Sequence, residues 1–203
     1  MGTSLSVAEK LIMKKRIRVL IAAVIVIFVA LGVGIVGFGY FPVARVDGST
    51  IYYRDVTSFV AAAENFKNLP GADPKIVEEL EKGQDDAHRA VLEELIIQRL
   101  ISLGADEFDP NEVEKKIQEN LSQVLSGTDR EQLEQAASRL YGMSFDDFTE
   151  AVVLPEIREI VIRQSVESRG ETFDAWLEER MKNTAINIYF LPYRWNGTML
   201  ENK

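Results

Sequence analysis

The sequence predicts a mainly α-helical protein: one N-terminal transmembrane helix, then a multi-helix domain whose short terminal β-strands pair with each other. Three observations lead to this fold class. Residues 19–41 form one apolar run without a charged side chain. Across most of residues 42–203, apolar side chains recur every three or four positions between capping and breaking residues, which is the helical period. The period changes to two only near residues 43–46 and 185–191, which predicts strands there.

Residues 19–41 have the length and composition of a membrane-spanning helix, because about 20 apolar residues are enough to cross the hydrocarbon core. The positive charges lie before this run rather than after it, where only Arg45 is nearby. The positive-inside rule therefore predicts a single-pass protein of the cytoplasmic (inner) membrane, with residues 1–18 in the cytoplasm and residues 42–203 outside it. The basic residues of the first segment are Lys10, Lys14, Lys15, Arg16 and Arg18.

A cleaved signal peptide is the alternative for the same run. Gly37 and Gly39 flank Phe38 in a small-x-small arrangement of the kind that signal peptidases cut. The apolar stretch is longer than the roughly 7–15 residues of an ordinary signal-peptide core. We therefore expect an uncleaved signal anchor over residues 19–41.

The composition excludes several classes of function. The chain has 203 residues, a net charge of −9, one histidine and no cysteine. Without cysteine there is no disulfide framework, no thiolate zinc site and no thiol nucleophile. Residues 1–40 carry five basic residues and one acid, so the remainder is more acidic than the chain as a whole. An acidic domain lacks the basic surface that nucleic-acid phosphates require, and we expect no nucleic-acid partner.

The first elements of the domain follow the membrane segment directly. Pro42 ends the membrane helix, and residues 43–46 alternate as a short strand does. Asp47-Gly48 is a turn signal, after which Ile51-Tyr52 continues the strand pattern. A helix is expected over residues 54–66, where apolar side chains recur at helical spacing.

The central helices are predicted from their caps and breaks. Asp73-Pro74 supplies the N-cap and first turn of a helix that Gly83 interrupts. The clearest helix of the chain follows over residues 88–103, and Gly104 is expected to close it. Residues 109–125 begin with Asp-Pro and continue with an apolar stripe, which predicts another capped helix.

The remaining helices show the same signals. Residues 128–140 begin with a capping box. A helix over residues 144–162 starts at a serine, and Pro155 should kink it or divide it in two. Thr172 caps a helix that extends to Met181. The closing strand then returns to the strand at the start of the domain, so residues 42–203 form one domain.

Catalytic side chains are scarce in this sequence. His88 lies on an amphipathic helix without a second ligand at metal spacing, so a surface or core-edge histidine is favoured over a general base or a metal ligand. Asp106, Glu107 and Asp109 lack the twelve-residue calcium loop and are interpreted as acids of a solvated turn. We expect no catalytic residue, no metal site and no cofactor.

Aromatic and methionine side chains are distributed over all the predicted helices. Most should belong to the core, but some are expected to line a groove that accepts apolar segments of other chains, as adaptable binding surfaces do. The candidate client-binding residues are Phe59, Phe66, Tyr141, Met143, Phe145 and Phe148.

Several ordered segments resemble the SurA/PrsA/PpiD family of extracytoplasmic folding factors. Residues 43–51 are similar to the family's opening strand-turn-strand, and residues 90–101 look like its "VLxxLIxxxLI" helix. Residues 110–113 and 142–148 resemble the starts of the next two helices, and residues 173–188 resemble the closing helix and strand. Each segment alone is a common pattern, whereas their order and spacing together are more specific.

The resemblance implies a SurA N-terminal-like chaperone domain, with one departure. Catalytic members carry a parvulin prolyl-isomerase module before the closing helix, whereas only a short segment separates Ser165 from Phe173 here and a domain needs at least about 50 residues. We therefore expect a membrane-anchored, ATP-independent holdase that binds unfolded or newly exported polypeptides and has no isomerase activity. The alternative is a scaffold that holds one folded partner, such as a translocon or another envelope complex.

Overall fold

The computed structural model describes residues 39–69, 87–127 and 129–203. The chain divides into two compact units, Met1–Phe41 and Pro42–Lys203, and the second contains nearly all of the described residues. Two predictions lie outside the described residues. They are the spanning segment over residues 19–41, of which only the last three residues are described, and the helix from Asp73 to Gly83. Among the helices that the structure does describe, none is both long and apolar enough to cross a membrane.

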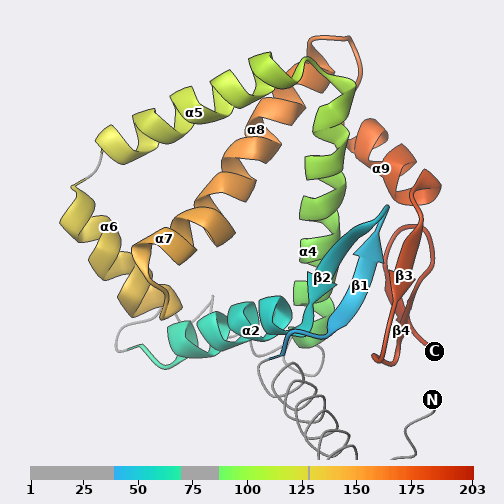
Figure 1. Ribbon diagram of the computed structural model, residues 1–203, viewed down its shortest axis with the longest axis horizontal. Helices are drawn as coiled ribbons and strands as arrows, with labels where there is room; N and C mark the ends of the chain where they lie inside the picture. The colour runs from blue at the N-terminus through green and yellow to red at the C-terminus, as the bar shows by residue number, and fades with distance from the viewer. Residues whose placement is uncertain (1–38, 70–86, 128) are drawn as a thin grey trace, which may run out of the picture. The chain divides into compact units, whose positions relative to one another are not determined.

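The domain is mainly helical with short antiparallel strands, as the sequence predicts. Figure 1 shows the helices arranged in a ring, with the strands on one side of α4. The helices are α2 (Tyr53–Lys67), α4 (Ala87–Gly104), α5 (Pro110–Ser126), α6 (Arg130–Ala136), α7 (Phe145–Phe148), α8 (Leu154–Glu167) and α9 (Phe173–Asn183). The shorter turns are η2 (Ala105–Glu107, 3-10), η3 (Ala137–Tyr141, π-helical) and η4 (Thr149–Val153, π-helical).

The two ends of the domain meet in one sheet, which confirms the predicted pairing. Strands β1 (Pro42–Val46) and β2 (Ser49–Tyr52) form a hairpin, and β3 (Ile186–Ile188) pairs antiparallel with the other edge of β1. The hairpin turn is Asp47-Gly48, and both residues have positive φ (43° and 88°). Asp-Gly is favoured in such two-residue turns because the twist of the turn then matches the twist of the strands.

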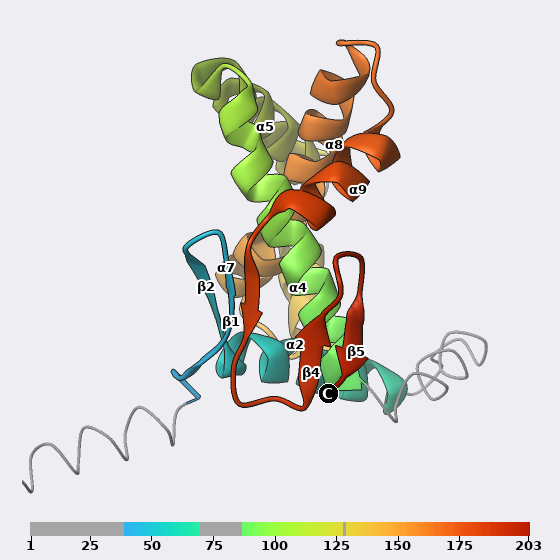
Figure 2. The same cartoon turned by 90° about the vertical axis from the view of Figure 1, so that its right-hand side faces the viewer.

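A second, two-stranded sheet at the end of the chain was not predicted from the sequence. Strands β4 (Tyr193–Trp195) and β5 (Leu200–Asn202) form a hairpin that Figure 2 shows beside α4. The backbone N–H of Leu200 donates to the Glu93 carboxylate of α4 at 2.6 Å, and the side chain of Leu200 is buried. Strands of three residues are too short to show an alternation of apolar and polar side chains. Contacts with α4 therefore specify this hairpin more than its local sequence does.

Helix caps agree closely with the sequence signals. The Asp109 side chain accepts from the backbone N–H of Asn111 at the start of α5, and Thr172 accepts from Ala175 at the start of α9. One capping prediction was shifted by a residue, since Asp129 accepts from the N–H of Glu131 and is the N-cap of α6.

Pro155 divides its helix, as predicted. The π-helical turn η4 ends at Val153, and Pro155 lies in the first turn of α8, where its missing N–H costs least. In a π-helical turn the backbone hydrogen bonds join residues five apart instead of four. This pattern suits the turn before Pro155, because the proline nitrogen has no hydrogen to donate to the carbonyl four residues earlier. The turn therefore lets the chain pass from α7 into α8 without a loop.

Helix α4 ends at Gly104, as predicted, but this glycine is not a left-handed cap and has a packing role that was not predicted. Its φ and ψ are −67° and −18°, so its backbone is helical rather than left-handed. A Cβ at this position would lie 2.4 and 2.6 Å from two carbons of the Trp176 indole. Glycine is required here because α9 packs its tryptophan directly on the backbone of α4.

Polar contacts hold the tryptophan in place. Its indole N–H donates to the Glu107 carboxylate at 3.0 Å, and Arg180 forms an ion pair with the same carboxylate. Arg169 donates to the Glu107 backbone carbonyl at 2.6 Å, and its guanidinium lies 3.9 Å from the centre of the Phe108 ring. The larger buried cluster beside them combines side chains of α4, α5, α8 and α9.

We predict that Gly104→Ala destabilises the domain by about 1–3 kcal/mol, the usual cost of inserting a methyl group into a filled core. Thermal unfolding of the full chain in detergent measures the change, with a fall in Tm of roughly 2–4 °C per kcal/mol. Gly127→Ala is the matched control, because a Cβ there meets no side chain and lies 3.2 Å from the Gln123 carbonyl and 3.9 Å from the Val124 carbonyl. Equal Tm values for the two variants would contradict the tight packing at Gly104.

Candidate functional site

An open cleft of about 1020 Å³ lies in the middle of the helical part of the domain. Its walls are the end of β2, one face of α2, one face of α4 and the chain from η3 to the start of α8 (Figure 1). The apolar lining residues are Ile51, Phe59, Ala61, Leu95, Ile101, Met143, Ala151, Leu154 and Pro155. Serine, threonine, asparagine, glutamine and tyrosine side chains alternate with these, so the cleft offers both apolar surface and hydrogen-bonding groups.

Helix α4 forms the back of the cleft and the centre of the core at once. Leu92, Ile96 and Leu100 are fully buried, whereas Leu95 and Arg99 are half-buried and line the cleft. Each cleft residue directly precedes a buried residue in the sequence, so the buried and the cleft-lining side chains lie on adjacent faces of α4. Rigid packing of one face therefore fixes the side chains of the other.

Helix α2 is joined across the cleft to the opposite wall by Asn65. Its amide nitrogen donates to the backbone carbonyls of Arg139 (2.7 Å) and Leu140 (3.1 Å) in η3. These carbonyls belong to the last turn before Gly142, which has φ of 65° and ends the π-helical segment. One side chain thus satisfies two terminal carbonyls and holds two elements together.

The wall opposite α4 contains both π-helical turns. Tyr141 of η3 and Ala151 of η4 line the cleft, and Met143 lies between them on the connecting segment. Ser144 caps α7 by accepting from the Asp147 N–H at 3.1 Å. Turns of this kind are rare and frequently occur at functional sites, because they place side chains where an ordinary helix would not.

The structure brings half of the candidate client-binding residues into this cleft. Phe59, Tyr141 and Met143 line it. Phe148 is outside the lining, but its ring supports Tyr141 at a centroid distance of 4.8 Å. Phe145 lies under the Arg130 guanidinium at 5.2 Å, and half-buried Phe66 of α2 is not part of the lining.

Sequence reasoning missed the α4 contribution. The sequence predicts the helix over residues 88–103 without separating the face of Leu95 and Arg99 from the buried face, although a charged residue among apolar ones is a sign of a second environment. Pro155 is predicted only to kink or divide its helix, and Leu154 is not singled out, yet both line the cleft. Their place in the cleft depends on how α8 packs against α4, which no local pattern reports.

The charges in the cleft are mostly negative. Six acids line it against three arginines, Arg54, Arg99 and Arg158. Asp55 and Glu159 have cationic neighbours, Arg54 at 3.3 Å and Arg163 at 2.6 Å respectively. The other four acids form no ion pair among the described residues; they are Glu94, Asp147, Glu150 and Glu156. Glu94 accepts a hydrogen bond from Gln98 and Asp147 accepts one from Ser144, but neither partner carries a charge. A ligand with positive charge can therefore pair with these acids without displacing a cation.

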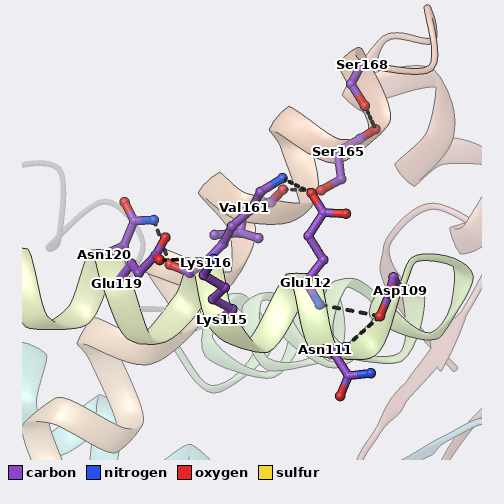
Figure 3. A network of polar contacts seen from close by, with 10 residues as sticks. All are labelled: Asp109, Asn111, Glu112, Lys115, Lys116, Glu119, Asn120, Val161, Ser165 and Ser168. Atoms are coloured by element: carbon purple, nitrogen blue, oxygen red, sulfur yellow. Dashed lines mark hydrogen bonds and ion pairs between the residues drawn. The ribbon is translucent and has the colours of Figure 1, made fainter.

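A second, smaller cavity of about 190 Å³ lies between α5 and α8. Figure 3 shows polar contacts within α5 and within α8: Lys116 pairs with Glu112 at 2.8 Å, and Ser165 donates to the Val161 carbonyl. Arg169, which also lines this cavity, donates to the Glu107 carbonyl of η2. These contacts satisfy helix side chains and backbone. They leave no convergent polar set for a ligand, so the larger cleft is the candidate functional site.

The ionisable residues singled out from the sequence have structural roles. His88 stacks on Tyr53 with a ring-centroid distance of 6.3 Å, and Glu107 and Asp109 anchor Trp176 and cap α5. In the described part of the chain no three histidine or carboxylate side chains are grouped as metal ligands. On the surface of α9, the hydrogen bond from Lys182 lowers the pKa of Glu178, which is fully exposed and far from any site chemistry.

Comparison with protein-family models, curated proteins and solved structures finds no match to this chain. The resemblance of residues 43–188 to the SurA/PrsA/PpiD family therefore stays a prediction. The features that bear on function are those of the cleft: its size, its mixed lining and its excess of negative charge.

We predict that Asn65→Ala lowers stability by about 1–2 kcal/mol, because two carbonyls of η3 lose their donor. It should also increase hydrogen exchange in residues 137–143, since α2 no longer holds this wall. Asn68→Ala is the matched control: its amide bonds only to the Glu64 carbonyl of its own helix. If both variants exchange alike in residues 137–143, Asn65 does not hold this wall in place.

Proposed function

We propose that the chain is a membrane-anchored extracytoplasmic chaperone of the SurA/PrsA/PpiD type without a parvulin module. It binds unfolded or newly exported polypeptides in the cleft, holds them against aggregation and releases them without ATP. The observation that carries this proposal is the open cleft of about 1020 Å³ between α2, α4 and the segment from η3 to α8.

The lining of the cleft suits an unfolded chain better than a small molecule. Small-molecule sites are enclosed and mostly apolar with few polar groups, whereas this cleft is open and alternates apolar with polar side chains. An unfolded segment presents the same mixture, because its backbone needs hydrogen bonds and its apolar side chains need cover. Met143 and Leu95 adapt to different apolar partners at small cost, since their side chains are flexible.

Anchoring places such a cleft where exported chains emerge. In this proposal residues 19–41 span the inner membrane with residues 1–18 in the cytoplasm, and the domain works next to a translocon or another envelope complex. Tethering raises the effective concentration of the cleft near the membrane, so weak binding of each client is sufficient.

The same domain can serve instead as a scaffold for one folded partner, and binding experiments separate the two functions. A holdase binds several unrelated unfolded proteins in competition with one another. A scaffold leaves their aggregation unchanged. Prolyl isomerisation measured on the same preparation should be at the uncatalysed rate, and acceleration would contradict the proposal that no isomerase activity is present.

We predict that the full chain in lipid nanodiscs slows aggregation of a chemically unfolded client at stoichiometric excess. The double variant Leu95→Ser/Met143→Ser should weaken client binding roughly 30-fold, because two lost apolar contacts at about 1 kcal/mol each sum to about 2 kcal/mol. Val124→Ser is the control: this valine is 44% exposed on α5 and outside the cleft. An absence of suppression by the unaltered protein, or equal loss in all variants, would contradict binding in the cleft.

We predict that the cleft prefers segments that combine apolar with basic residues, because four of its acids have no cationic partner among the described residues. Of two peptides with the same apolar residues, the one carrying lysine should bind more tightly than the one carrying glutamate. The difference should shrink with added salt.

The preference should depend on particular acids. Glu150→Gln/Glu156→Gln is expected to reduce it roughly two- to fivefold, which is the usual size for exposed charge pairs. Glu167→Gln/Glu171→Gln removes the same charge outside the cleft and should leave it unchanged. Equal binding of the two peptides at low salt would contradict the charge argument while leaving the holdase proposal intact.

A further inference from the structure

The connection between β3 and β4 contains a strained turn with an exposed aromatic side chain at its tip. Phe190 has φ of 58°, and the N–H of Leu191 donates to the carbonyl of Tyr189 at 2.7 Å, which closes a three-residue γ-turn. Left-handed backbone is unfavourable for a bulky residue, and glycine would adopt it without cost. Phe190 is nevertheless present and is 82% exposed, the highest value among the large apolar residues that the structure describes.

This turn lies at the end of the domain where the chain enters from the membrane segment. The N–H of Tyr189 donates to the carbonyl of Val43 at 2.9 Å, so the turn is fixed beside the first residues of β1. Both Figure 1 and Figure 2 show the start of β1 and the β3–β4 connection at the same end of the domain. Val43 is only two residues beyond the predicted spanning segment, residues 19–41.

The turn is also held on its other side, and a cation accompanies it. The Lys203 ammonium donates to the Leu191 carbonyl at 3.0 Å, and its backbone N–H donates to the Pro192 carbonyl at 2.9 Å. These bonds fix the turn so that Phe190 is presented outward. Apolar side chains such as phenylalanine, accompanied by basic residues, enter the boundary between lipid headgroups and acyl chains.

We propose that the Phe190 turn is a second membrane contact, in which the phenyl ring enters the interfacial layer of the bilayer that residues 19–41 span. This inference rests on the proposed membrane anchor. The anchor keeps the turn close to the bilayer, so one aromatic side chain is enough to occupy the interface for much of the time. The contact would fix the tilt of the domain and hold the cleft in one orientation toward emerging chains.

The exposed apolar residues of α5, α8 and the β4–β5 turn do not share this placement, whereas exposed Tyr52 pairs with Pro42 at the start of β1 and exposed Tyr40 precedes that strand. Val124 and Ile160 belong to α5 and α8, and Met199 lies in the turn between β4 and β5, away from the start of β1 (Figure 2). They therefore serve as internal controls for a contact confined to the Phe190 turn.

The absence of cysteine from the chain allows a direct measurement, because one introduced cysteine is labelled alone. The full chain carrying Phe190→Cys and an environment-sensitive fluorophore is reconstituted into vesicles of phosphatidylethanolamine and phosphatidylglycerol. We expect blue-shifted emission and several-fold stronger quenching by a lipid nitroxide than for the same label at Val124→Cys. Equal emission and equal quenching at the two positions would overturn the inference.

A second measurement retains the native side chain in the reference protein. Phe190→Gly should fold normally, because glycine accepts the positive φ of this turn. In nanodiscs, a spin label at Val124→Cys should become more mobile in the Phe190→Gly background, since the domain loses its second contact. Met199→Ser, in the other turn, should leave the mobility unchanged. Unchanged mobility with Phe190→Gly would overturn the inference.

Failure of this contact can be distinguished from failure of the proposed anchor. If the chain does not float with the vesicles, the anchor is wrong and the inference falls with it. If the chain floats but the label at position 190 reports water, only the second contact is wrong. Suppression of client aggregation is a separate readout that neither result determines.

Discussion

The indole of Trp176 lies directly on the backbone of Gly104, and this contact determines how the last part of the chain returns to its longest helix. Because Gly104 has no Cβ, α9 can approach α4 closely. The approach places Trp176 and Arg180 on the Glu107 carboxylate and brings the chain after α9 to the edge of β1. The terminal strands then pair, and the end of the domain is joined to its beginning. A looser contact at Gly104 would separate the sheet from the helical part.

The position of α4 explains why the domain can be rigid and still have an open cleft. Its inner face is fully buried, and its neighbouring face carries Leu95 and Arg99 into the cleft. On the opposite wall, the Asn65 side chain of α2 holds η3 through two hydrogen bonds to its carbonyls. The opening is therefore framed by fixed elements, and its side chains, rather than its backbone, adapt to what binds. This arrangement supports a holdase that accepts varied segments.

Local signals allowed much of the fold to be predicted from the sequence, and long-range packing accounts for the rest. The caps at Asp109, Ser144 and Thr172 and the division of the helix at Pro155 each depend on a few consecutive residues. The pairing of the two terminal strands followed from their period and from the need to close the domain. The end of α4 at Gly104 was predicted, but its contact with Trp176 was not, because the tryptophan is far away in the sequence. The same holds for the β4–β5 hairpin and its contact with Glu93. For the cleft, the selection of aromatic and methionine side chains identified Phe59, Tyr141 and Met143. The lining residues of α4 could not be predicted, because they depend on how the helices cross.

The central claim is that the cleft binds unfolded chains, and photo-crosslinking from inside it is the most direct test. A photoreactive amino acid is placed at Leu95 in the full, membrane-embedded chain, and a second protein carries it at Val124, outside the cleft. During secretion of several unrelated proteins, the account predicts crosslinks from Leu95 to many of them before they fold, and few from Val124. Crosslinks from Leu95 to a single folded partner, or equal crosslinking from both positions, would contradict it.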